Sequence, residues 1–125
     1  MIRIVAVVFA VCLFAGVMSA ADGKLMHCFA FTAIESATAA DWDAFYKASD
    51  ALPGKVPGLL HVWVGKLRRP LKAGDAVRQY GACMEFNDQA ALKAYESDPA
   101  HTAWVSAYEK VRVPHTLTFD ILPPQ

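Results

Sequence analysis

Four segments of the chain have the short alternating or continuous apolar patterns that are typical of β-strands. The first is the clearest, because its alternate residues Leu25, His27 and Phe29 fall on one face. The segment between the second and third strands combines basic residues with Pro70, and this composition predicts a loop over residues 67–76. The predicted strands are residues 25–31, 59–66, 78–86 and 115–121.

Three further segments have helical spacing and recognisable ends. Thr38 followed by Asp41 forms the capping-box pattern of a helix start, and the pair Pro53 and Gly54 ends that helix. Asp88 caps a short second helix, and an aspartate–proline pair opens a third one directly after it. The element order along the chain is therefore β-α-β-β-α-α-β.

This order predicts an α+β domain of the ferredoxin-like kind, with helices on one face of a four-stranded antiparallel sheet. A right-handed crossover from the first strand to the second leaves room for the third between them, so we expect the strand order 4-1-3-2. The opposite face would carry Met26, Cys28, Trp63 and Cys83, which is too apolar for contact with water. We therefore expect a homodimer that covers this face and forms a dimeric α+β barrel.

The N-terminus has the pattern of a secretory signal. Arg3 precedes an almost wholly apolar run over residues 4–16, and small residues follow as far as Ala21. We expect cleavage after Ala21, a mature domain of residues 22–125, and a secreted or periplasmic location. The apolar run is short for a membrane span, so no span is expected in the mature chain, and a retained N-terminal anchor is the alternative.

Charge argues against a nucleic-acid partner. The chain has 12 Lys and Arg against 12 Asp and Glu, and loss of Arg3 with the signal leaves 11 basic residues. The cluster of Arg68, Arg69 and Lys72 lies in the predicted loop and is too small for a basic binding stripe. The four histidines and scattered carboxylates have no recognisable metal-ligand spacing, so no metal site is expected.

Cys28 and Cys83 remain in the mature chain, on strands that we expect to be antiparallel neighbours. Both have the opposite parity to His27 and Tyr80, and should therefore face the partner sheet. Their Cα atoms should be close, which allows a cross-strand disulfide outside the cytoplasm. Buried free thiols that act as small apolar residues are the alternative.

His101 and Tyr95 form the candidate chemical pair of the chain. Asp98 and Pro99 open the third helix, so His101 lies in its first turn, where the helix dipole favours a neutral imidazole. Tyr95 lies one turn before the break and could bring its phenol to the same space. The alternative is structural: His101 would hold the helix in place, and His27 would be a hydrogen-bonded histidine of the core.

With this order in hand, the chain resembles the stress-responsive α/β-barrel domain family of the dimeric α+β barrel superfamily. The resemblance extends over essentially the whole mature chain, and its most specific part is the Pro-Ala-His segment after a tyrosine-bearing helix. The matching segments are residues 26–31, 52–59, 64–66, 84–86, 94–95 and 98–101.

The family includes a plant polyketide cyclase that closes a ring by aldol condensation without a cofactor. The resemblance implies catalytic roles at the positions of His101, Tyr95 and His27, and it implies that no cofactor is used. Two polar positions of that enzyme's site differ here, since Ser49 replaces a tyrosine and Tyr80 replaces a histidine. The proton-transfer network would therefore differ.

Two hypotheses for function follow. In the first, the protein binds a small, apolar, carbonyl-bearing ligand; His101 is the base, Tyr95 the acid or hydrogen-bond donor, and His27 an orienting group. In the second, the protein is a dimeric module of the stress response without catalysis, and its aromatic side chains fill the space that a ligand would need. The residues predicted to line the ligand site are Phe29, Phe31, Trp42, Ser49 and Tyr80.

Overall fold

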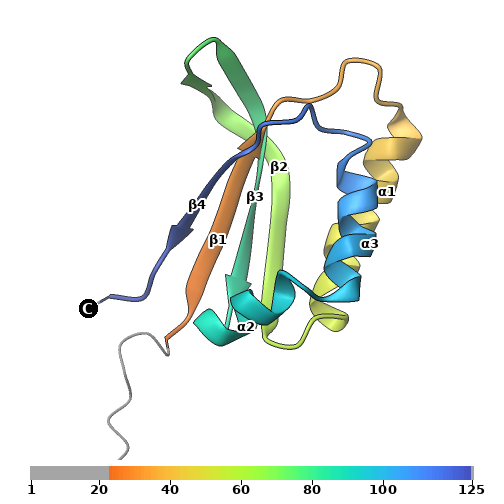
Figure 1. Ribbon diagram of the computed structural model, residues 1–125. Coiled ribbons are helices and arrows are strands. Elements are labelled where there is room, and N and C mark those ends of the chain that lie inside the picture. Colours follow the sequence, from red (N-terminus) through yellow and green to blue (C-terminus); the bar gives the residue numbers. More distant parts are fainter. Residues whose placement is uncertain (1–22, 125) are drawn as a thin grey trace, which may run out of the picture.

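A four-stranded antiparallel sheet forms one layer of the molecule, and helices cover one of its faces (Figure 1). The computed structural model describes residues 23–124. The strand order β2-β3-β1-β4 is the predicted order read from the other edge, so the ferredoxin-like prediction is confirmed. The elements are β1 (Leu25–Phe31), α1 (Ala39–Ala51), the 3₁₀ turn η2 (Leu52–Gly54), β2 (Leu59–Ala73), β3 (Ala76–Phe86), α2 (Gln89–Tyr95), α3 (Pro99–Tyr108) and β4 (Leu117–Ile121).

The helix starts follow the predicted capping chemistry. The Thr38 hydroxyl accepts from the Asp41 amide at 3.1 Å, and the Asp41 carboxylate accepts from the Thr38 amide at 2.9 Å. These bonds from Thr38 lower the pKa of Asp41. Asp98 accepts from the Ala100 amide at 2.8 Å at the start of α3. This cap fixes the first turn of α3, and with it the position of His101.

The core lies between the sheet and the layer of α1 and α3. Phe31 on β1 is fully buried and meets Phe45 of α1 and Tyr108 of α3 edge to face, with ring centroids 6.1 and 5.0 Å apart. Such aromatic contacts add to the burial energy of the rings, which is about 1.5–3 kcal/mol for each large side chain. This cluster fixes α3 against β1 and therefore sets the wall of any site between them.

The predicted loop over residues 67–76 is wrong. β2 continues through Ala73 and turns at Gly74 into β3, so the two strands form an arm that projects beyond the sheet (Figure 1). The pairing passes from Lys66 with Tyr80 to Leu71 with Arg78, so five steps along β2 match two steps along β3. This bulge accommodates Pro70, which has no amide proton for a regular ladder.

Cys28 and Cys83 face each other across β1 and β3, with Cα atoms 4.2 Å apart. The predicted proximity is confirmed, and the structure shows the disulfide rather than two free thiols. The bond lies on the open face of the sheet. On the same face Leu117, Phe119 and Ile121 of β4 are between 38% and 56% exposed.

None of the helices within residues 23–124 is long and apolar enough to cross a bilayer. The predicted signal, residues 1–21, lies outside the residues that the structure describes.

Candidate active site

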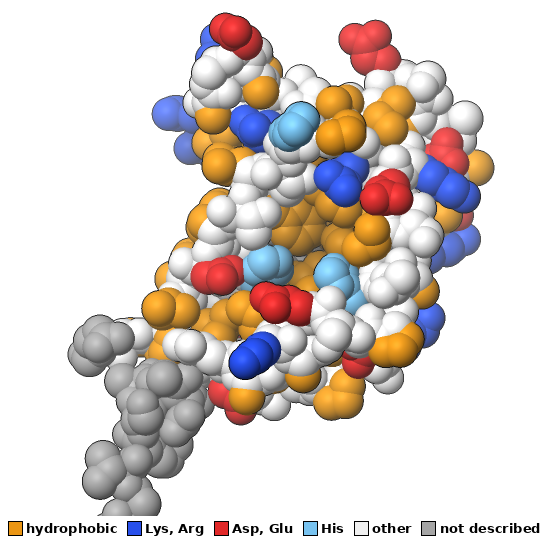
Figure 2. Space-filling model, in the orientation of Figure 1, with side chains coloured by type: hydrophobic (Ala, Val, Ile, Leu, Met, Phe, Trp, Pro, Cys, Tyr) orange, Lys and Arg blue, Asp and Glu red, His pale blue; other side chains and the backbone are white. Residues whose placement is uncertain are grey.

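A cavity of about 230 Å³ opens between α3 and the β1–β4 edge of the sheet. Figure 2 shows an apolar hollow on this face of the molecule, with histidine side chains at its rim. The strand parity explains the arrangement, because alternate residues of β1 and β4 point to the helix side, and α3 supplies the facing stripe. The lining residues are His27, Phe29, Tyr95, His101, Trp104, Val105, Tyr108, Arg112, Thr116 and Thr118.

His27 on β1 is held by a carboxylate from β4. Its Nδ1 lies 2.6 Å from Oδ1 of Asp120, and the two residues are register partners across the β1–β4 pairing. A carboxylate only accepts, so Nδ1 carries the proton and, in the neutral ring, Nε2 has the free lone pair. This side chain is only 22% exposed. The contact therefore fixes the ring and presents a proton acceptor at the rim of the cavity.

His101 and Tyr95 form the opposite wall. Their ring centroids are 4.2 Å apart, and His101 Nδ1 lies 3.3 Å from the carbonyl oxygen of Glu96. A carbonyl also only accepts, so this weaker bond again leaves Nε2 free. Burial strongly raises the pKa of Tyr95, so its phenol keeps its proton and serves as a donor.

Aromatic rings form the floor of the cavity. Phe29 meets Trp104 and Tyr108 with centroids 5.8 and 5.3 Å apart. Ser49 lies behind this floor: its hydroxyl accepts from Trp104 Nε1 at 2.9 Å and donates to the Phe45 carbonyl at 2.8 Å. Ser49 therefore positions Trp104 and does not reach the cavity.

Three other predicted lining residues lie elsewhere. Trp42, Phe31 and Tyr80 pack on one another, with centroids 4.6 Å apart for Trp42 and Tyr80 and 5.8 Å for Phe31 and Tyr80. None of them lines the cavity. Their rings occupy the space between α1 and the far end of the sheet. Of the five residues predicted to line the ligand site, only Phe29 lies in the cavity together with His27, Tyr95 and His101.

Sequence reasoning missed Asp120 and Arg112. Asp120 alternates with apolar residues of β4, and only the β1–β4 register reveals that it meets His27. Arg112 follows α3, and its guanidinium lies 4.7 Å from the centre of the Tyr108 ring. The sequence did contain a signal for Arg112. His101, Trp104 and Tyr108 follow helical spacing along one stripe, and the next position of that stripe is Arg112.

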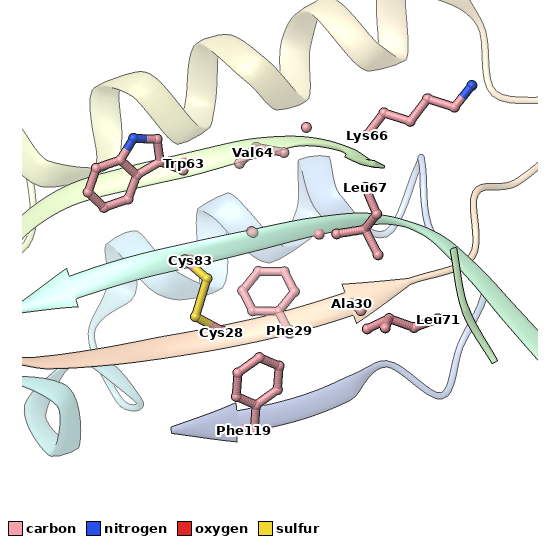
Figure 3. A pocket seen from close by; sticks show the side chains of 13 residues that line it. Cys28, Phe29, Ala30, Trp63, Val64, Lys66, Leu67, Leu71, Cys83 and Phe119 are labelled. Carbon is pink, nitrogen blue, oxygen red and sulfur yellow. A yellow bond between two sulfur atoms is a disulfide. The ribbon is translucent and has the colours of Figure 1, made fainter. Parts of the chain in front are cut away.

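A second hollow, of about 350 Å³, lies on the open face of the sheet around the disulfide (Figure 3). Trp63, Leu71 and Phe119 form its apolar walls. Among the residues 23–124 that line it, Lys66 is the one charged side chain, and there is no pair of acid–base side chains. Within residues 23–124, no group of three or more His, Cys, Asp or Glu side chains is arranged to hold a metal ion. The candidate active site is therefore the smaller cavity beside α3.

The fold and this cavity define a ferredoxin-like α+β domain with a small, aromatic, histidine-bearing pocket. Residues 25–122 match the stress responsive A/B barrel domain family over most of the chain, and the protein belongs to that family. The predicted family is thereby confirmed. No curated protein sequence matches this chain.

Solved structures with the same fold are similar over most of this chain. A Dabb family protein with a ferredoxin-like fold from Mesorhizobium loti is 22% identical, with 82% of this chain and 99% of that chain covered and a TM-score of 0.63. A dimeric ferredoxin-like protein of unknown function from Bacteroides fragilis is 18% identical, with 80% and 96% covered and a TM-score of 0.60. The hydroxynitrile lyase of Passiflora edulis is 9% identical, with 83% and 96% covered and a TM-score of 0.66.

Proposed function

We propose that the protein binds a small carbonyl compound in the cavity beside α3 and transfers protons to and from it without a cofactor. One observation carries this proposal: two imidazoles with occupied Nδ1 atoms and a protonated phenol line a single aromatic cavity of about 230 Å³. Free Nε2 lone pairs accept protons, and a phenol donates to a carbonyl oxygen on which negative charge develops.

In this proposal His27 is the base, which is the role that the sequence predicted for His101. Its 2.6 Å contact with Asp120 is shorter than the 3.3 Å contact of His101 with Glu96. A carboxylate behind an imidazole fixes the ring and compensates the charge that it gains when Nε2 takes a proton. Nε2 of His27 would remove a proton from the carbon next to the carbonyl. Tyr95 would donate a hydrogen bond to the resulting enolate oxygen, and His101 would exchange a proton with the ligand from the same wall.

The named activity of one structural neighbour supports this reaction class. The Passiflora edulis protein is a hydroxynitrile lyase, and cleavage of a hydroxynitrile to a carbonyl compound requires proton transfer from oxygen. At 9% identity the likeness extends to the fold alone, so the residues of the cavity, and not the neighbour, carry the proposal.

Exchange of α-protons with solvent tests the proposal. We would follow small ketones, phenylacetone among them, by proton NMR in D₂O. Substitution of His101 with Ala should slow the enzymatic exchange by at least about tenfold, because it removes one of the exchanging groups. The melting temperature should stay within a few degrees. The control is H115N: His115 is an exposed histidine with φ 76°, which asparagine tolerates, and it does not line the cavity.

A non-catalytic module of the stress response is the second candidate, and the size of the cavity favours it. The volume of about 230 Å³ lies below the roughly 300–1,000 Å³ of typical ligand pockets. Under this alternative, His101 supports α3 and the H101A variant loses roughly 3 kcal/mol or more of unfolding free energy. Absence of exchange in the wild-type protein, combined with such a loss of stability, would favour the module.

We also propose that two copies associate through the open face of the sheet. Trp63, Phe119 and Ile121 are each about half exposed on the described chain, and such a contiguous apolar face marks an interface. The related protein from Bacteroides fragilis is dimeric, which supports the same arrangement here. Light scattering after size exclusion should give twice the chain mass.

The location that we propose is secreted or periplasmic, with residues 1–21 as a cleaved signal. The Cys28–Cys83 disulfide supports this proposal, because disulfides persist in oxidising compartments. Mass spectrometry of the protein from its native cell should find an N-terminus at Asp22 and a mass that increases on reduction. An N-terminus that includes residues 1–21 would instead identify a retained anchor.

A further inference from the structure

The candidate cavity has a marked asymmetry of charge. Ten residues of the described part of the chain line it; among them Arg112 is the one permanently charged side chain, and none is a carboxylate. Asp120 and Glu109 contact lining groups but do not themselves line the cavity. An arginine at the wall of a mostly apolar pocket is suited to an anionic oxygen pair, because its donors form a planar fork.

The contacts of Arg112 leave part of this fork available. Its guanidinium lies over the Tyr108 ring, and Nη1 donates a long bond of 3.4 Å to the Thr116 hydroxyl. Glu109 approaches Nη2 only at 3.6 Å, and that carboxylate is 61% exposed, so water screens the pair. The buried Nε has no hydrogen-bond partner among the residues that the structure describes. The side chain is therefore oriented by Tyr108 while its hydrogen-bonding capacity remains incompletely used.

Arg112 and the acid–base groups lie at opposite ends of the cavity. His101 and Tyr108 are seven residues apart on α3, which corresponds to about 10 Å, and Arg112 lies beyond Tyr108. On the facing wall, Asp120 of β4 and Thr116, which directly precedes that strand, are separated by about 13 Å of extended chain. The two walls agree on the ends of the cavity: Asp120 contacts His27 at one end, and Thr116 contacts Arg112 at the other.

We propose that Arg112 anchors the carboxylate of the ligand and so places the opposite end of the ligand between His27 and the Tyr95–His101 wall. The proposal rests on the proposed function and adds the class of ligand: a small organic acid with one ring or a short branched chain. The volume of about 230 Å³ sets this size limit. Tyr108 does not compete as an anion, because burial raises its pKa to about 12.

Matched acids and amides test the anchor. We would titrate the protein, as isolated from its native cell, by calorimetry with 3-phenylpropanoate, benzoate and cyclohexanecarboxylate, and with the primary amide of each acid. Each pair has nearly the same shape and differs in charge. We expect at least one acid to bind roughly tenfold more tightly than its amide, because a charge-assisted pair with arginine is lost in the amide.

The variant R112Q should remove this preference and leave amide binding within about threefold, since glutamine retains a donor but no charge. R112K should restore only part of it, because lysine lacks the planar fork. Glu109 offers a control with the opposite expected effect. E109Q should tighten acid binding, because it removes the carboxylate that lies 3.6 Å from Arg112 Nη2 and competes with the ligand. Melting temperatures of all three variants should match that of the wild type, which excludes a general structural effect.

The outcomes separate the two proposals. Equal binding of acids and amides, or an acid preference that survives in R112Q, would overturn the role of Arg112 and leave the cavity as a ligand site. Binding of neither series, with no shift of the His27 and His101 ring resonances in NMR spectra, would overturn the proposed function and the anchor with it.

Discussion

The two faces of the sheet use the same strands for different purposes. On the helix side, β1 and β4 supply His27 and Thr118 to a small polar-rimmed cavity, and Asp120 of β4 holds His27 from outside it. On the open side, the neighbouring residues Cys28 and Phe119 belong to a larger apolar hollow. Because side chains alternate along a strand, adjacent residues serve separate surfaces. Chemistry and assembly can therefore be tested independently in this protein.

The largest effect is expected from the helix side. H27A should reduce α-proton exchange by about 10²–10⁴-fold, because it removes the proposed general base. Association through the open face should be unchanged, since His27 points to the opposite side of β1. NMR exchange rates and light scattering on the same sample measure both. If H27A retained exchange but lost the dimer, His27 would belong to the interface between two copies and not to the acid–base site.

The matching change on the open face is F119D. A charge in the apolar interface should convert the protein to a monomer, with the dimer dissociation constant raised by about 100-fold or more. Exchange per chain should persist, because Phe119 lies on the open face of the sheet with Cys28 and does not line the cavity. Size exclusion with light scattering is the measurement, and T118V on the other side of β4 is the control. An F119D protein that stays dimeric would contradict the proposed interface.

The disulfide gives the next effect in size. Replacing Cys28 and Cys83 together with serine should lower the unfolding free energy by about 2–4 kcal/mol, because the bond closes a loop of 55 residues in the unfolded chain. Urea denaturation measures the loss. The cavity should be little affected, since the bond lies on the other face, so ligand binding below the unfolding transition would remain. A selective loss of binding with unchanged stability would show that the faces are coupled.

The smallest effect concerns the pH dependence of stability. Burial raises the pKa of Tyr95 and Tyr108 in the folded state, so above pH 10 the unfolded chain ionises first and binds fewer protons. The contribution of the two tyrosines to stability should therefore be constant below pH 10 and fall above it, by at most about 1.4 kcal/mol per pH unit for each tyrosine. Y95F should reduce this slope in urea titrations between pH 9 and 11. An unchanged slope in Y95F would place its phenol in water.

The sequence predicts the scaffold well because its signals are local. Thr38 and Asp98 cap helices through contacts within three residues, and the alternation of β1 depends on adjacent positions. The arm over residues 67–76 was missed because Pro70 suggests a break, whereas a bulge in β2 absorbs it. Such a bulge depends on the partner strand and has no local signature.

The candidate site was predicted in part for the same reason. Tyr95 and His101 are near neighbours in the chain, so a helix break is enough to bring them together. Asp120 meets His27 across 93 residues, and only the register of β1 and β4 defines that contact. Tyr80 and Trp42 were expected to line the site, but their rings pack against each other and fill the space instead.

A histidine held by a carboxylate makes the helix-side cavity an acid–base site in this proposal, and a single substitution at Asp120 probes that role. D120N keeps the size of the side chain and removes the charge beside His27 Nδ1. D120N should slow α-proton exchange at least about tenfold with an unchanged melting temperature, while D75N, in the exposed turn of the β2–β3 arm, should exchange at the wild-type rate. Exchange at the wild-type rate in D120N would show that the carboxylate has no part in the acid–base chemistry.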